Sequence, residues 1–141
     1  MKILVILFLL VFLPGCSAMQ IRELFMGMSV EDVKNAEKQY AKTFDLGAAY
    51  CYEQALESVK DMQARPLRED REKYFLTANR FDNAYTLCID TTQLGILIVP
   101  LGDGKSGVEI ASGDYGLAKF VSEKLFSRLA EQEKLHAEGK R

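Results

Sequence analysis

The chain has 141 residues with a formal net charge of −2 at pH 7, and 48% of its residues are hydrophobic. This length fits one domain with a buried core, and the apolar content excludes disorder throughout the chain. Because a mildly acidic chain without a basic block offers no electrostatic complement to phosphate, we exclude nucleic acid as a partner.

The first sixteen residues predict export. Lys2 gives a cationic start, residues 3–13 form an unbroken apolar run, and Gly15 places a small residue before Cys16. This is the layout of a secretory signal. The apolar run of 11 residues is too short to cross a bilayer as a helix, which takes about 20. The alternatives are an uncleaved anchor, which this length opposes, and a buried amino-terminal strand, which the abrupt change of composition after Cys16 opposes.

The end of this signal, Leu13-Pro14-Gly15-Cys16, resembles the lipobox of bacterial lipoproteins. The resemblance implies that residues 1–15 are removed as a signal peptide and that Cys16 is lipidated, with a diacylglycerol on its thiol and an acyl chain such as palmitate on its amino group. It also implies a protein anchored in the cell envelope. In Gram-negative lipoproteins, a residue other than Asp after the lipidated cysteine, here Ser17, is typical of an outer-membrane protein that faces the periplasm.

Two cysteines remain, Cys51 and Cys88. An even pair in an oxidising compartment favours a disulfide, which would stabilise the fold by about 4 kcal/mol because it closes a long loop. The alternative is two separately buried thiols. No Cys-x-x-Cys occurs in the sequence, so we do not expect a catalytic dithiol.

Residues 16–28 predict a lipidated tether, and a helix is expected to begin after Ser29. Ser29 can cap the helix, and Glu31 and Asp32 suit its first turn. The Gly-Met-Ser start also resembles that of a small lipoprotein of the outer-membrane barrel-assembly machinery. It is equally typical of any capped helix.

A short strand is predicted around residues 41–44. Asp45 is then expected to cap a long helix that runs through Ala64 and is stopped by Arg65-Pro66. Residues 67–73 carry alternating charges of both signs, which predicts a solvated connection.

The next part of the chain predicts a run of strands. Residues 74–81 and 84–90 alternate in polarity around a possible turn, and residues 94–101 form a near-continuous apolar run that predicts burial on both faces, with Pro100 at its end. Residues 102–107 have the composition of a hairpin loop, followed by a strand at residues 108–111.

Part of that loop, Gly104-Lys105-Ser106, matches the last three residues of a phosphate-binding P-loop. We reject this motif because Val99 stands where its first glycine is needed and because a strand follows where a helix is required.

The last predicted element is a helix after Asp114 that runs through about Glu133. Its apolar face repeats at helical spacing and consists of Leu117, Ala118, Val121, Leu125 and Leu129. The polar residues 134–141 beyond it are expected to fray.

The order of elements predicts a single α+β domain at residues 29–133. We expect two layers, with an antiparallel sheet of three to five strands under two long helices on one face. This β-α-β-β-β-α-like order resembles the helix-grip-like domains of periplasmic lipoproteins, including another barrel-assembly subunit. A resemblance of architecture does not transfer function.

Few residues suggest chemistry. His136 is the only histidine and lies in the polar tail, so the sequence offers no histidine triad and no multi-histidine zinc site. We therefore predict no cofactor, no metal site and no enzymatic activity. The most chemical-looking cluster is Asp90-Thr91-Thr92, although Asp and Thr beside a turn usually bond to their own backbone.

Three functions remain, of which we prefer the first. It is a non-catalytic interaction module, anchored through Cys16, whose sheet edge or helix groove engages another envelope protein. The second is a binder of a small ligand in the concavity between helices and sheet. The third is a minor hydrolase around Asp90 and Thr92.

Overall fold

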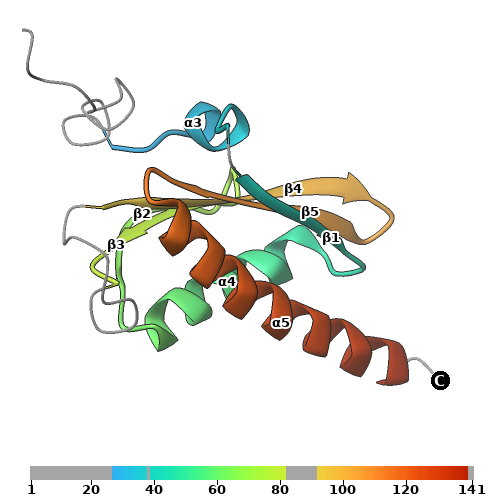
Figure 1. The fold of residues 1–141 in the computed structure, drawn as a ribbon. Helices are drawn as coiled ribbons and strands as arrows, with labels where there is room; N and C mark the ends of the chain where they lie inside the picture. Colours follow the sequence, from blue (N-terminus) through green and yellow to red (C-terminus); the bar gives the residue numbers. More distant parts are fainter. Residues whose placement is uncertain (1–26, 38, 82–91, 140–141) are drawn as a thin grey trace, which may run out of the picture.

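The computed structural model describes residues 27–37, 39–81 and 92–139. A five-stranded antiparallel sheet carries the two long helices on one face and a short helix on the other (Figure 1). The elements follow one another as α3 (Val30–Lys34), β1 (Gln39–Phe44), α4 (Ala48–Asp61), β2 (Arg65–Asp70), β3 (Phe75–Asn79), β4 (Leu94–Gly102), β5 (Lys105–Ser112) and α5 (Tyr115–Gly139). The predicted α+β class, with an antiparallel sheet under two long helices, is confirmed.

The strands lie in the order β1-β5-β4-β3-β2, so β4 is central and β1 and β2 form the two edges. The prediction that residues 94–101 are buried on both faces is confirmed for the first half of β4. Leu94, Ile96 and Ile98 join the core beneath α4 and α5, whereas Leu97 joins the cluster on the opposite face.

The main core lies between the sheet and the two long helices. The predicted apolar face of α5 is confirmed, because its residues at a spacing of four are fully buried there. The side chains from the sheet and from α4 that meet this face include Phe44, Tyr52, Val59, Ile96, Val108 and Ile110.

A smaller apolar cluster lies on the opposite face, under α3. It consists of Met28, Val33, Phe75, Leu97 and Ala111.

Helix α3 starts where the sequence predicts. The Ser29 hydroxyl accepts a hydrogen bond from the Asp32 N–H at 3.2 Å, and the Asp32 carboxylate accepts one from the Ser29 N–H at 2.8 Å. The helix ends after five residues, so α3 depends on its packing against the sheet.

Gly95 permits this packing. A Cβ at position 95 would lie 2.5 Å from Met28 Sδ and 2.5 Å from Val33 Cγ2. We expect Gly95→Ala to lower the free energy of unfolding by about 2 kcal/mol, because α3 must shift away from the sheet. Gly107→Ala in β5 is the matched control, because its nearest contact would be an ordinary 3.8 Å. Urea denaturation measures both variants, and an equal effect of the two would contradict this account.

The first part of the charged run after α4 is a strand, so the predicted solvated connection is wrong for residues 67–70. Residues 71–73 form an exposed turn, as predicted. Residues 65–70 form β2, which pairs only with β3. An edge strand needs one ladder of hydrogen bonds, so it tolerates Pro66 and exposes its charged side chains to water. The alternating charges of residues 67–70 therefore belong to a strand whose side chains are mostly exposed to water.

The predicted limits of α4 are also wrong. The helix begins at Ala48 with Gly47 as its N-cap, and no side chain caps it. The Asp45 N–H donates to the Glu133 carboxylate of α5, and the Asp45 carboxylate pairs with Lys105 at 3.3 Å. The helix ends at Asp61, ahead of the expected Arg65-Pro66 stop.

Pro100 does not end β4. The strand passes through an irregularity between Pro100 and Gly102 and then turns at Asp103-Gly104, where both residues have positive φ (51° and 73°). Two residues of this kind make a tight hairpin turn that matches the twist of the strands. Strand β5 therefore starts at Lys105, three residues before the predicted Val108. Lys105 and Ser106 belong to this strand, so a strand stands where a P-loop would need a helix.

Helix α5 continues to Gly139, so the predicted end of this helix near Glu133 is wrong. Two contacts with α4 hold this part. The Tyr50 hydroxyl donates to Gln132 Oε1 at 2.8 Å, and the Tyr50 ring packs edge-on against the His136 ring at 4.9 Å.

Several predictions lie outside the described residues. They concern the signal and Cys16 within residues 1–26, the turn and strand within residues 82–90, Cys88, and Asp90. Within the ranges that the structure describes, no helix is both long enough and apolar enough to cross a membrane.

Candidate binding groove between α4 and α5

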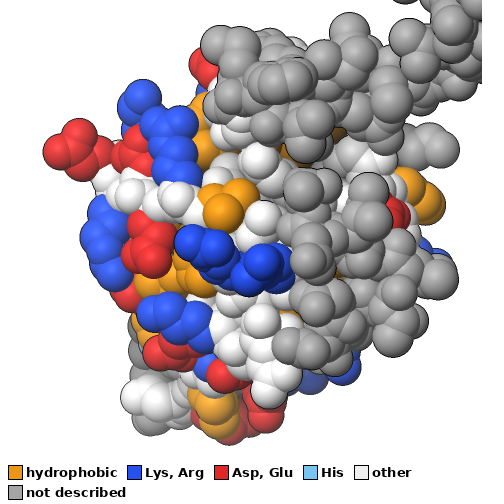
Figure 2. Space-filling view, turned by 90° about the vertical axis from the view of Figure 1, so that its left-hand side faces the viewer, with side chains coloured by type: hydrophobic (Ala, Val, Ile, Leu, Met, Phe, Trp, Pro, Cys, Tyr) orange, Lys and Arg blue, Asp and Glu red, His pale blue; other side chains and the backbone are white. Residues whose placement is uncertain are grey.

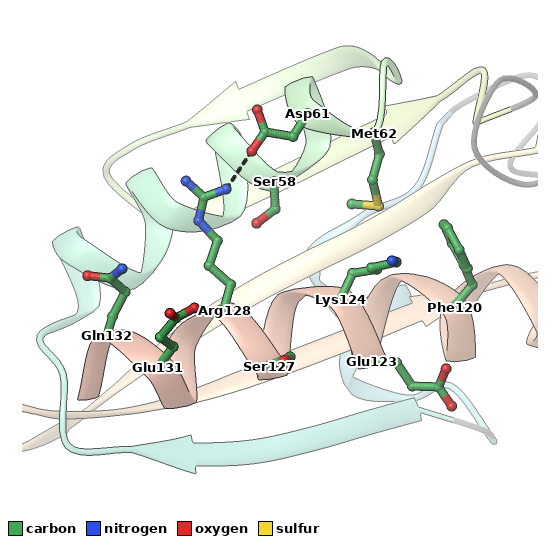
Figure 3. Close-up of a pocket in the computed structure, with 10 residues that line it drawn as sticks. All are labelled: Ser58, Asp61, Met62, Phe120, Glu123, Lys124, Ser127, Arg128, Glu131 and Gln132. Atoms are coloured by element: carbon green, nitrogen blue, oxygen red, sulfur yellow. Dashed lines mark hydrogen bonds and ion pairs between the residues drawn. The ribbon is translucent and has the colours of Figure 1, made fainter. Parts of the chain in front are cut away.

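An open groove of about 1010 Å³ lies between the two long helices. Ser58 and Asp61 of α4 line one wall together with Met62, the residue that caps the end of α4. The other wall belongs to α5, and Figure 3 shows Met62 and Phe120 near one end of the groove and Gln132 near the other. The groove therefore runs along both helices.

Arg128 joins the two helices across this groove. Its Nε donates to Gln54 Oε1 at 2.8 Å, its Nη2 to Glu57 Oε2 at 2.7 Å, and its Nη1 to Asp61 Oδ2 at 2.6 Å. The last of these bonds is the dashed line in Figure 3. Because the guanidinium is a rigid planar fork, three partners on successive turns of α4 fix its orientation. The Arg128 network, as we call these four residues, is therefore organised before anything binds.

The charges around the groove are unequal. Glu57 and Asp61 supply two negative charges to the single positive charge of Arg128. Glu123 and Glu131 also line the groove, whereas Lys124 is the second cation. The Lys124 ammonium lies 5.9 Å from the centre of the Phe120 ring. The groove thus presents a mildly acidic rim with an apolar end.

The concavity between the helices and the sheet, where we predicted a site for a small ligand, is occupied by the protein itself. Tyr52, Val59, Ile110 and Leu125 are all buried there at 0% or 1% exposure. The candidate site is therefore the open groove between the helices.

Two of the residues that we singled out for chemistry, Thr92 and His136, lie in the described part of the chain. Thr92 is partly buried beside β4, and its predicted neighbour Asp90 lies outside the described residues, so the hydrolase hypothesis stays a prediction. His136 lies at the far end of α5 against Tyr50. No group of three His, Cys, Asp or Glu residues that could hold a metal ion occurs in the described part of the chain.

Cys51 is fully buried and stands as a free thiol. Its Sγ donates to the Leu46 carbonyl at 3.9 Å, and burial raises the pKa of the thiol. Because the thiolate is the reactive form, Cys51 is poorly suited to act as a nucleophile. In this structure Cys51 is a thiol, and its disulfide with Cys88, which lies outside the described ranges, stays a prediction for the oxidised protein.

The groove was not predicted residue by residue, although a signal for it exists. Gln54, Glu57 and Asp61 recur every three or four residues on α4 and therefore share one helix face. What the sequence conceals is their partner, because Arg128 lies more than 60 residues further along the chain.

No family model matches this chain, and no curated protein matches it.

Proposed function

We propose that the protein is a non-catalytic interaction module of the cell envelope. Lipid on Cys16 anchors it, with the domain facing the periplasm from the outer membrane, and the α4–α5 groove docks another envelope protein. The lipobox-like Leu13-Pro14-Gly15-Cys16 supports the anchor. The observation that carries the docking site is the Arg128 network, which holds charged groups in fixed positions at an open surface.

The composition of the groove suits a protein partner. Protein interfaces combine an apolar anchor with a polar rim, and arginine is enriched in them. Here Met62 and Phe120 provide the apolar end, and the charged groups follow along the groove. Because Arg128 is already oriented, a partner that binds there loses little side-chain entropy on the side of this protein.

Site-specific photo-crosslinking in cells tests this proposal. A photoreactive amino acid at Ser127, which lines the groove, is expected to give one discrete crosslinked product. The matched position on the same helix is Glu138, which is exposed but outside the groove, and it should not give that product.

A second variant connects the product to the Arg128 network. Arg128→Ala is expected to abolish the Ser127 crosslink while lowering the free energy of unfolding by about 1 kcal/mol or less, because the carboxylates that pair with Arg128 are largely exposed. Arg71→Ala removes a comparable exposed pair, with Glu53, and should leave the crosslink intact. Equal crosslinking from Ser127 and Glu138, or a product that survives Arg128→Ala, would contradict docking in the groove.

A further inference from the structure

The two edges of the sheet differ in how they meet solvent. Strand β2 carries four charged residues and Pro66 among its six residues, and its pairing with β3 shifts between Pro66 and Arg68. These are the features by which edge strands resist further pairing. Figure 2, which shows the side of the molecule where β2 and β3 lie, has positive and negative side chains intermixed on its surface.

Strand β1, at the other edge, has fewer of these features. It holds one charged residue, Lys42, has no proline, and pairs with β5 in unbroken register from Gln39 to Phe44. Ala41, Lys42 and Thr43 are exposed in succession. In an antiparallel edge strand, alternate residues turn their N–H and C=O groups away from the sheet, so β1 offers a ladder on which another strand can pair.

Helix α5 lies beside this edge and adds side-chain contacts. The ring of Tyr115 stacks on that of Tyr40 with centroids 5.5 Å apart, and the ring of Phe126 lies 5.8 Å from that of Phe44. Tyr115 is 51% exposed. A strand added along β1 on this side would therefore meet the exposed Tyr115 ring near one end of β1. Near the other end it would meet the partly buried Phe126 ring, which lies beside the buried Phe44.

Lys42 lies between these aromatic contacts on the same face of the strand. Its ammonium is 5.3 Å from the centre of the Phe44 ring. No residue in the described part of the chain forms an ion pair with it. The face of β1 that turns to α5 thus carries an aromatic residue at Tyr40, a cation at Lys42 and a second aromatic residue at Phe44.

We propose that β1 is a strand-addition site for an extended segment of a partner protein, with an acidic residue opposite Lys42 and an apolar residue two positions away on each side. Main-chain hydrogen bonds supply affinity in this mode of recognition, and alternate side chains supply specificity. On the other face, the small side chains of Ala41 and Thr43 leave room for the second set of side chains. The proposal concerns a different surface from the α4–α5 groove and does not depend on it.

A second copy of this chain is a poorer occupant of the edge. Antiparallel pairing of two β1 strands centred on Lys42 would place the two ammonium groups directly opposite each other, and like charges in that position are destabilising. The charge of β1 therefore favours an acidic segment over another β1.

A designed heptapeptide tests the proposal. The peptide Thr-Val-Thr-Glu-Thr-Val-Thr places Glu opposite Lys42 and Val opposite the two aromatic positions, and the control peptide carries Lys in place of Glu. Each is added to the full chain in detergent micelles, and hydrogen exchange followed by mass spectrometry is measured. We expect the Glu peptide to protect the amides of residues 39–44 and to bind about fivefold more tightly than the Lys peptide.

A charge exchange completes the test. Lys42→Glu, at an exposed position, should reverse the preference of the two peptides, whereas Arg68→Glu on β2 should not change it. Equal binding of both peptides, protection at β2 in place of β1, or no protection would each overturn the proposal. So would protection of β1 that appears without peptide and rises with protein concentration, because the occupant would then be a second copy.

Discussion

Leu125→Ala is expected to lower the free energy of unfolding by about 3 kcal/mol. Leu125 is fully buried in α5 and belongs to the core that joins both long helices to the sheet. The truncation removes buried methyl groups and leaves a cavity that the helix cannot fill, because contacts at both of its ends hold it in place. Urea denaturation followed by circular dichroism measures the loss.

The matched control is Leu135→Ala on the same helix. Leu135 is 55% exposed, so the same chemical change at that position should alter the free energy of unfolding by less than about 0.5 kcal/mol. The two variants change helix propensity alike, and their difference therefore reports burial. Similar losses for both would mean that α5 does not pack on the sheet through its Leu125 face.

The comparison of α5 with β2 shows what the sequence can predict about this fold. The apolar face of α5 and the apolar run of β4 were predicted because burial against a large core leaves a periodic or continuous hydrophobic pattern. Strand β2 was missed because an edge strand of charged residues carries no such pattern. Its strand character comes from pairing with β3, which the local sequence does not encode.

Helix and strand ends were missed for a related reason. Asp45 can cap a helix by its chemistry, yet in the fold it bonds to Glu133 and Lys105, which are distant in sequence. Proline usually ends a strand, yet β4 accommodates Pro100 because the pairing with β5 becomes irregular at that point. Tertiary contacts decided both cases.

The sequence predicted the type of candidate site but not its residues. A groove between helices and a sheet edge were both expected for an interaction module, but no residue of either was assigned. The proposed role of Arg128 depends on three partners on another helix, and the proposed role of β1 depends on its position at the edge of the sheet beside α5. Topology brings these residues together, and a single sequence does not reveal topology.

The largest effect on location is expected from Cys16→Ala. Lipid attachment requires the Cys16 thiol, and the 11-residue apolar run before it is too short to replace a lipid anchor by spanning the bilayer. Cells fed labelled palmitate should incorporate label into the unaltered protein and none into the variant. The variant should also leave the membrane fraction, or retain its signal and migrate at a higher mass.

Ser17→Asp is the control for this experiment, because it keeps the thiol and changes only the neighbouring residue. It should retain the palmitate label and, by the sorting preference of Gram-negative lipoproteins, move from the outer to the inner membrane. The eleven residues from Cys16 to Met26 reach at most about 40 Å, so the proposed anchor would restrict the described domain to a thin layer beside the membrane. Confinement of this kind raises the effective concentration of the domain near membrane partners, and a docking interaction too weak to form in solution can then operate at the membrane surface. If Cys16→Ala kept its label, its mass and its membrane location, both the anchor and this account of the groove would have to be abandoned.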